Sequence, residues 1–344
     1  MPSSLKPPLE PMEAATVDEI PLGWEWQYEP KWDGFRCLIF RDGDKVFLQS
    51  KSKPLARYFP EVVANVLKLK AKHFVLDGEL VIEQNGQLSF EALLARLHPA
   101  ASRVLKLSAE TPAKFIAFDL LQDEQQTPLI DEPLFVRRSA LEDFAKRNFR
   151  ANNLILSPAT IDSAEAEKWF GTTGGGLDGI MAKLIAAPYT PGERIAMVKY
   201  KHLRTADCVV GGFRYGSGNG AASRIVASLL LGLYDSDGLL NHVGFTSAMS
   251  VEERTALTPK LEKLIGKPGF TGKAPGGPSR WNNGRESEWQ ALKSKLVVEV
   301  QYDHFSGDRF RHGTGFVRWR PDKKPSACTF AQLKLARGSA LDLV

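Results

Sequence analysis

The sequence contains few cysteines. Its 344 residues include only Cys37, Cys208 and Cys328, which are widely spaced. So few thiols exclude a disulfide framework and a cysteine-rich zinc module, and they suit a reducing compartment. No run of about 18 apolar residues occurs, so we expect no transmembrane helix. Residues 1–19 are rich in proline and acidic residues and do not resemble a signal peptide. We therefore expect a cytoplasmic protein that has no membrane partner.

The charge is distributed unevenly along the chain. Residues 1–200 contain 24 basic and 27 acidic residues, a net charge of −3, whereas residues 201–344 contain 21 and 13, a net charge of +8. A basic half is typical of proteins that bind a polyanion such as nucleic acid. A solvated surface would give the same count, so charge alone leaves nucleic-acid binding open.

The first 200 residues predict a mixed α+β region. Trp24, Trp26 and Tyr28 alternate with polar residues, which is typical of a strand. Strands and helices do not follow each other as regular βαβ units, so we expect a mostly antiparallel sheet. We predict strands within 22–50 and at 74–82, 115–121, 180–184 and 196–201, and helices at 60–72, 136–149 and 163–170.

The pattern changes near residues 202–206, after which most segments are short strands. One helix begins at Ser250, where Ser250-x-x-Glu253 forms a capping-box pattern. Several short strands with one helix fit a small barrel such as an OB-fold. We therefore expect domains at 1–202 and 203–335, with a loosely held tail at 336–344. The expected strands of the second domain are 208–213, 228–234, 239–245, 296–302 and 315–319, and residues 266–284 are a predicted loop.

Lys31 is the first candidate for chemistry, since it ends a predicted strand just before the turn Asp33-Gly34. A lysine amine becomes nucleophilic only when its ammonium form is disfavoured, either by burial or by neighbouring positive charge from lysines or a metal ion. A hairpin turn with solvated charges around it is the alternative. The segment alone does not decide between them.

Three further segments carry charged side chains at strands. Asp77-Gly78-Glu79 supplies two carboxylates, and Asp178 and Lys183 flank another strand. Lys199 and Lys201 share one strand face, because side chains repeat every two residues. Such acids can hold a divalent metal, and such cations can hold a triphosphate and lower the pKa of a neighbouring lysine. Charged strand edges would explain any one segment, but the series favours a nucleotide site.

This series resembles the motifs of the covalent nucleotidyltransferases, which include DNA ligases, RNA ligases and mRNA capping enzymes. The resemblance spans about residues 20–335. In its compact form, the chain resembles the small bacterial C-type ATP-dependent DNA ligases. The matching segments are Lys31-x-Asp33-Gly34-x-Arg36 for motif I, Ser50-Lys51 through Pro60-Glu61 for Ia, Asp77-Gly78-Glu79 for III, Phe118-Asp119 for IIIa, Asp178-Gly179-Ile180-Met181-x-Lys183 for IV, Lys199-x-Lys201 for V and Arg318-Trp319-Arg320-Pro321-Asp322-Lys323 for VI.

The resemblance implies an ATP-grasp-like nucleotidyltransferase domain in residues 1–202, followed by an OB-fold domain. It implies that the protein seals nicks in duplex DNA, in DNA repair. Lys31 would take AMP from ATP, pass it to the 5′-phosphate at a nick, and the 3′-hydroxyl would then displace AMP. The implied cofactors are ATP and Mg²⁺ or Mn²⁺. The implied partners are nicked duplex DNA and other repair proteins, and we expect a monomer associated with the bacterial nucleoid.

The resemblance also implies roles for individual residues. Phe118 and Met181 would cover the two faces of adenine, Glu29 would contact its edge, and Arg36 and Glu79 would hold the ribose. The implied catalytic residues are Lys31, Asp33, Arg36, Lys199, Lys201, Arg320 and Asp322. The implied nucleotide-binding residues are Glu29, Pro30, Lys31, Arg36, Lys51, Glu79, Phe118, Met181, Lys183, Lys199 and Lys201, and the implied metal ligands are Asp178, Glu79 and Asp77.

Two positions depart from the family pattern, and two other functions stay open. Lys51 stands where the family usually has arginine, so it can meet a phosphate only as a point charge. Asp178 stands where many members have glutamate. An RNA ligase or a capping enzyme would share the nucleophile, although the form of residues 318–323 favours a DNA ligase. A nucleic-acid-binding module with a decayed site is the third possibility, and the complete motif series argues against it.

Overall fold

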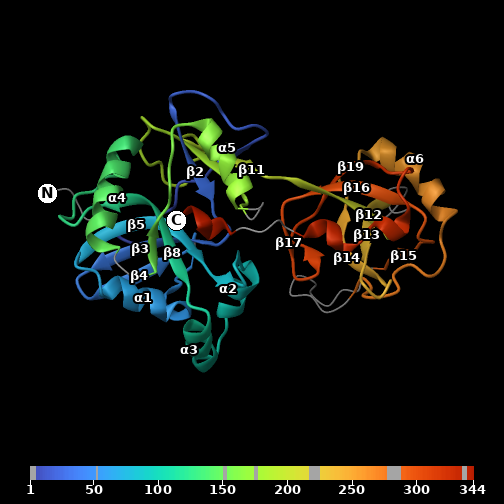
Figure 1. The fold of residues 1–344 in the computed structure, drawn as a ribbon, viewed down its shortest axis with the longest axis horizontal. Coiled ribbons are helices and arrows are strands. Elements are labelled where there is room, and N and C mark those ends of the chain that lie inside the picture. Colours follow the sequence, from blue (N-terminus) through green and yellow to red (C-terminus); the bar gives the residue numbers. More distant parts are fainter. Residues whose placement is uncertain are drawn as a thin grey trace. The chain divides into compact units, whose positions relative to one another are not determined.

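The computed structural model describes residues 5–51, 53–149, 153–173, 177–216, 225–276, 288–334 and 339–344. These residues form two compact units (Figure 1). Unit 1 contains the described residues up to His202 together with 339–344, and unit 2 contains those from Leu203 to Lys334. Among the helices of these residues, none combines the length and the apolar character needed to cross a bilayer.

Unit 1 is built around two sheets. The first has the strand order β1-β11-β10-β2, and the second has the order β4-β3-β5-β8-β9. Most neighbouring strands are antiparallel; β1 with β11 and β8 with β9 are the parallel pairs. The bounds are β1 Ala15–Val17, β2 Trp26–Lys31, β10 Gly179–Leu184, β11 Met197–Lys201, β3 Phe35–Asp42, β4 Lys45–Gln49, β5 His73–Val81, β8 Lys114–Gln122 and β9 Leu154–Leu156.

The second sheet is buried on both faces. Alternate residues of β3 point to opposite sides, so Cys37 and Ile39 join the core beneath the helices, whereas Leu38 and Phe40 pack with Met197 of the first sheet. Arg36 has the parity of Leu38 and therefore lies on the side that meets the first sheet. The helices of unit 1 are α1 Pro60–Leu67, α2 Phe90–Arg96, α3 Ala101–Glu110, α4 Leu134–Asn148 and α5 Ser163–Thr172, and β6 Glu83–Gln84 pairs with β7 Gln87–Leu88.

Unit 2 is a closed five-stranded barrel with the strand order β14-β13-β12-β16-β19, in which neighbours are antiparallel. A parallel bridge between Thr246 and Thr314 joins the two edges of this sheet, and the Thr246 Oγ1 hydroxyl donates to the Thr314 carbonyl at 2.8 Å. This closure is that of an OB-fold barrel. The bounds are β12 Arg204–Tyr215, β13 Val226–Tyr234, β14 Leu240–Thr246, α6 Val251–Glu262, β15 Gln290–Ala291, β16 Val297–Tyr302, β17 Phe305–Ser306, β18 Arg309–Phe310 and β19 Gly315–Trp319.

Helix α6 begins as the sequence predicts. The Glu253 backbone N–H donates to Ser250 Oγ at 3.1 Å, and the Ser250 N–H donates to Glu253 Oε2 at 2.7 Å. Both hydrogen bonds of the capping box are therefore present.

Two expected element bounds differ from the structure. Strand β2 begins at Trp26, where pairing with β10 begins, and Trp24 lies before it with its side chain 89% exposed. Helix α1 ends at Leu67 rather than near Lys72. In unit 1, the sequence did not predict β1, β6, β7, β9, α2 or α3. Of the predicted loop at 266–284, residues 277–284 lie outside the described residues.

Residues 339–344 are not the loosely held tail that we expected. They form a short 3-10 turn in which Ser339 Oγ accepts the Leu341 N–H at 3.2 Å and Asp342 Oδ2 accepts the Ser339 N–H at 2.7 Å. Ala340 is buried in the same apolar cluster as Trp169 and Ile180. The segment is held because its apolar side chains pack in this cluster. No local sequence pattern predicts this packing.

Candidate active site

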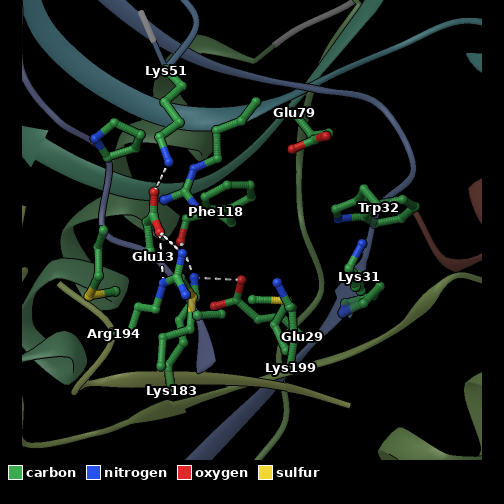
Figure 2. A pocket seen from close by; sticks show the side chains of 17 residues that line it. Glu13, Glu29, Lys31, Trp32, Lys51, Glu79, Phe118, Lys183, Arg194 and Lys199 are labelled. Atoms are coloured by element: carbon green, nitrogen blue, oxygen red, sulfur yellow. Dashed lines mark hydrogen bonds and ion pairs between the residues drawn. The ribbon is translucent and has the colours of Figure 1, made fainter. Parts of the chain in front are cut away.

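A cavity of about 400 Å³ lies in unit 1, lined by side chains from both sheets and from the segment before β1 (Figure 2). This volume is typical of small-molecule sites. The lining includes every predicted nucleotide-binding residue except Lys201. The full set is Pro11, Met12, Glu13, Ala14, Glu29, Pro30, Lys31, Trp32, Arg36, Lys51, Glu79, Phe118, Met181, Lys183, Arg194, Met197 and Lys199.

Strand register brings three predicted residues into one row across the first sheet. Glu29 on β2 is paired with Met181 on β10, and Met181 is paired with Lys199 on β11. Directly paired residues on adjacent strands point to the same face. A carboxylate, a thioether and an ammonium group therefore line the cavity side by side, although more than 150 residues separate Glu29 from Lys199 in the sequence.

The next row contains Lys31, Gly179 and Lys201. Gly179 has no side chain, and a Cβ atom there would lie 2.1 Å from the Tyr200 carbonyl oxygen. Only glycine allows β10 and β11 to approach this closely. Lys31 on β2 and Lys201 on β11 therefore lie on the same face of the sheet, with Gly179 of β10 between them. Lys201 itself is outside the cavity lining.

The Lys31 ammonium contacts the carboxylate of Asp178, which is nearly buried. Burial lowers the pKa of Lys31, but Asp178, Glu79 and Asp33 outweigh this effect and raise it. We expected neighbouring lysines to lower the pKa of Lys31; it is raised instead, because the ammonium is in contact with the Asp178 carboxylate. The effect expected of Lys31 is instead found at Lys199, whose pKa is lowered by burial, by Lys31 and by Lys201.

Lys183 lies in a buried ion pair rather than free to meet phosphates. Its Nζ is 2.8 Å from Glu29 Oε2 and 4.7 Å from the centre of the Phe118 ring. Gln27 Nε2 donates to the other carboxylate oxygen of Glu29 at 2.8 Å. These contacts fix Glu29 and Phe118 at one end of the cavity, so Lys183 positions the two residues that were expected at adenine.

Asp77 binds Arg36 instead of pointing to a metal site. Arg36 Nε donates to Asp77 Oδ1 at 2.9 Å and Nη2 donates to Oδ2 at 2.5 Å. The Tyr189 hydroxyl donates to Oδ2 at 2.7 Å and accepts the Met12 N–H at 3.0 Å. Both oxygens of this fully buried carboxylate are therefore engaged, and we remove Asp77 from the expected metal ligands. The fixed Arg36 guanidinium lies 5.1 Å from the Phe118 ring centre.

Glu13 bridges two cations at the cavity. Its Oε1 contacts Lys51 Nζ, and its Oε2 is 2.6 Å from Arg194 Nη2 and accepts Arg194 Nε at 2.8 Å. Hydrogen bonds from Lys51 and Arg194 lower the pKa of Glu13 to about 2. The carboxylate is therefore ionised at any pH at which the protein would work.

Asp178 and Glu79 are the carboxylates that remain for a cation. Within the residues that the structure describes, no group of three potential metal-ligating side chains occurs. Mg²⁺ bound with a nucleotide commonly takes only one or two carboxylates plus phosphate oxygens. Both side chains lie beside Lys31, and burial raises the pKa of Glu79 to about 8. A cation would favour its ionised form, so this donor pair fits a nucleotide-bound divalent ion.

The motif VI residues form a cluster on unit 2. Arg320 Nη1 donates to Asp207 Oδ1 at 2.8 Å, and its Nη2 lies 2.8 Å from Asp322 Oδ2. Lys323 Nζ lies 2.7 Å from Asp207 Oδ2. Hydrogen bonding to Arg320 lowers the pKa of Asp322 to about 2. Asp207 thus anchors the cluster to β12, and the roles of Arg320 and Asp322 beside the nucleotide stay predictions.

Comparison with known proteins decides the family. The family model described as ATP dependent DNA ligase domain matches residues 11–201, and that described as ATP dependent DNA ligase C terminal region matches residues 222–323. This chain belongs to the ATP-dependent DNA ligases. The match favours a DNA ligase over the RNA-ligase, capping-enzyme and binding-module alternatives.

Individual relatives agree with this assignment. The ligase is 45% identical over 346 residues to DNA ligase C2 of Mycolicibacterium smegmatis, covering 95% of this chain and 94% of that protein. It is 30% identical over 307 residues to the multifunctional non-homologous end joining DNA repair protein LigD of Mycobacterium tuberculosis, covering 88% of this chain and 37% of LigD. A solved Lig E DNA ligase has 19% identity and a TM-score of 0.53, covering 90% of this chain and 99% of that one, which concerns the fold alone.

Several residues of the site escaped the sequence interpretation. Glu13, Arg194 and Tyr189 lie in segments without the periodicity of a strand or helix, and Met12 enters the site through its backbone. Trp32 is buried and donates to Ser157 Oγ at 3.0 Å, and it also lines the cavity. In the ligase sequence, the one feature that could have indicated a role for Arg194 is its position five residues before Lys199.

Proposed function

We propose that this ligase carries AMP on Lys31 and uses it to seal nicks in duplex DNA. The observation that carries the proposal is the convergence of Lys31 with Phe118, Met181 and Glu29 on one nucleotide-sized cavity. In the first reaction, Lys31 Nζ would bond to the α-phosphorus of ATP while the bond to pyrophosphate breaks. AMP would then pass to a DNA 5′-phosphate, and the adjacent 3′-hydroxyl would displace it.

Adenine fits the end of the cavity that is formed by Phe118 and Met181. An aromatic ring and a polarizable thioether suit the two faces of a base. The Arg36 guanidinium carbon and the Lys183 Nζ lie 5.1 Å and 4.7 Å from the centre of the Phe118 ring. Glu29 lies in the strand row of Met181. Its oxygens already accept from Gln27 and Lys183, and one of them would accept a further hydrogen bond from the adenine edge.

Phosphate groups would meet the cationic side of the cavity, where Lys51, Arg194 and Lys199 lie. We keep Lys201 as a candidate because it shares the sheet face with Lys31. Asp178 and Glu79 are the residues that would hold Mg²⁺ or Mn²⁺, and such an ion would neutralise phosphate charge. The amine of Lys31 is uncharged only after it has given up a proton, and its ion pair with Asp178 keeps it oriented until then.

The phosphates of DNA would be contacted by unit 2 and by the cationic side of the cavity in unit 1. The net charge of +8 in residues 201–344 supports this. The similarity to a relative named as a DNA repair protein supports a role in repair. We also propose that the ligase acts as a cytoplasmic monomer at the bacterial nucleoid, where repair proteins would recruit it.

Substitution of the nucleophile tests the proposal. Lys31→Ala should fold normally and should acquire no label from ATP labelled at the α-phosphate, because no other amine occupies its position. Lys45→Ala is the matched control, since Lys45 is exposed on β4 and lies outside the cavity lining. Retained labelling in Lys31→Ala, or failure of the unsubstituted ligase to seal a 5′-phosphorylated nick with ATP, would contradict the proposal.

A further inference from the structure

The bridge from Glu13 to Lys51 and Arg194 places a carboxylate where a phosphate would be expected (Figure 2). A carboxylate and a phosphate oxygen present the same chemistry to these cations, since both accept charge-assisted hydrogen bonds from an ammonium or a guanidinium group. All three residues line the nucleotide cavity. An internal anion and a substrate anion therefore compete for one pair of cations.

The fold determines the position of Glu13. Its backbone N–H donates to the Glu193 carbonyl at 2.8 Å, and the Gly192 N–H donates to the Pro11 carbonyl at 3.3 Å. Strand β1 follows directly and pairs with β11. Gly192 has φ +75°, a backbone conformation that glycine adopts without strain, so glycine suits this turn of the chain. The backbone is tied on both sides of Glu13, and only its side chain needs to move.

The contacts that Glu13 makes are ones that a stronger anion can displace. The side chains of Lys51 and Arg194 are 73% and 65% exposed, while that of Glu13 is 21% exposed. Exposed ion pairs contribute little to stability, because water screens the attraction between the two charges. A phosphate with nearly two negative charges and three acceptor oxygens meets the same cations more strongly than a single carboxylate does.

We propose that Glu13 is a built-in competitor that keeps the Lys51–Arg194 phosphate site closed until a substrate phosphate displaces it. The inference rests on the proposed function, because it assumes that this cavity receives phosphate-bearing substrates. Glu13 would exclude weakly binding anions from the Lys51–Arg194 site. It would also make the affinity of the site for phosphate lower than the two cations alone would give. The phosphate belongs either to the nucleotide or to the 5′ end of a DNA nick.

The first experiment measures phosphate binding without chemistry. Full-length protein is freed of AMP with pyrophosphate and dialysed, and the binding of inorganic tripolyphosphate is measured by calorimetry. Glu13→Gln should bind it about 3- to 10-fold more tightly than the unsubstituted protein, as the loss of two exposed ion pairs implies. Glu10→Gln is the matched control, with the same change of charge three residues earlier at an exposed position outside the cavity lining, and should change the affinity less than twofold.

A second arm distinguishes the two sources of phosphate. Binding to a nicked duplex with a 5′-phosphate is compared with binding to the same duplex with a 5′-hydroxyl. If the DNA phosphate uses the site, Glu13→Gln should raise affinity only for the phosphorylated nick. A gain confined to tripolyphosphate assigns the site to the nucleotide, and a gain in both assigns it to both.

Two outcomes would overturn the proposal. One is an unchanged or weaker affinity of Glu13→Gln in both arms. The other is a gain that persists in Glu13→Gln/Arg194→Gln, because the gain should require the freed guanidinium. Covalent labelling by ATP is followed in parallel: loss of labelling in the unsubstituted protein would contradict the proposed function, whereas tripolyphosphate binding reports on Glu13 independently.

Discussion

The hydroxyl of Tyr189 connects three parts of the nucleotide site that lie far apart in the sequence. It accepts from the Met12 backbone and donates to Asp77, which holds Arg36 by two hydrogen bonds. Arg36 in turn lies against Phe118. At the scale of single residues, the site is thus a set of fixed charges whose orientation depends on a neutral hydroxyl.

Tyr189→Phe should therefore impair nucleotide positioning more than folding. The substitution keeps the buried ring, which the Arg137 guanidinium approaches to 5.7 Å, but it removes a hydrogen bond to a carboxylate worth about 1.5–3 kcal/mol. We expect the ATP concentration for half-maximal labelling of Lys31 to rise about 10-fold, with a smaller change in the maximal rate. Single-turnover labelling at varied ATP measures both. Tyr58→Phe, outside the cavity lining, is the control, and equal behaviour of the two variants would count against the role.

His242 should make the stability of unit 2 depend on pH. Burial, Arg309 and Arg214 lower its pKa to about 4, against about 6.5 in an unfolded chain. The unfolded state therefore binds a proton between these values that the folded state does not. The contribution is fully present above pH 6.5 and is lost as the pH falls toward 4; it amounts to about 2–3 kcal/mol.

The variant His242→Phe isolates this effect. Its ring can keep the edge contact with Phe270, which is 5.3 Å away between ring centres, and it removes an Nε2 atom that has no hydrogen-bond partner in the described structure. Urea unfolding at pH 7 and pH 4.5 should show a smaller loss of stability in the variant. An equal loss in both proteins would show that His242 titrates normally.

Residue roles could be predicted only as far as the motif series reaches. Lys31, Phe118 and Met181 line one cavity, and the roles that the resemblance implies for them stay predictions. The partners of Asp77 and Lys183 depend on side-chain contacts between distant segments. The sequence therefore identified these two residues but not their ion pairs with Arg36 and Glu29.

At the scale of elements, the first sheet brings the predicted site residues together, with β10 and β11 in close contact at Gly179. The three strands β2, β10 and β11 bring Lys31, Met181 and Lys199 to one face. Strands that are rich in consecutive apolar residues, such as β5 and β8, could be predicted from the sequence. Strand β1 could not, because its three residues become a strand only by pairing with β11. Helices α2 and α3 were not predicted either.

Gly179→Ala should separate β10 from β11 and weaken both folding and AMP transfer. The added Cβ would meet the Tyr200 carbonyl oxygen at 2.1 Å, so the strands must move apart. We expect about 2 kcal/mol or more of lost stability, as for overpacked sites, and a large fall in the rate of Lys31 labelling. Gly171→Ala in α5 is the control, since a Cβ there meets nothing within 4 Å and alanine favours a helix. Normal labelling in Gly179→Ala would contradict the expectation.

At the scale of the whole molecule, charge is divided between the two halves of the sequence. Residues 201–344 carry +8 and residues 1–200 carry −3, so we expect DNA binding and AMP transfer to respond differently to salt. Neutralising about four DNA phosphates would lower DNA affinity about 100-fold between 50 and 200 mM salt. Labelling of Lys31, which depends on short contacts within unit 1, should change much less. Fluorescence anisotropy and labelling across this salt range measure the two effects, and parallel decline would refute the division.

The return of residues 339–344 to unit 1 makes unit 2 an insertion that is attached to unit 1 by two connections. Gln332 and Asp207, 125 positions apart, exchange hydrogen bonds at 2.8 Å and 3.0 Å near the two ends of unit 2. While unit 2 is folded, the ends of this long loop are already together. If unit 2 unfolded, docking of Ala340 onto unit 1 would require closing this long loop, and the entropy lost on closure would oppose the docking. Chain connectivity thus makes the stability of each unit depend on the folding of the other. Unfolding of one unit should lower the free energy of unfolding of the other, with no contact between them required.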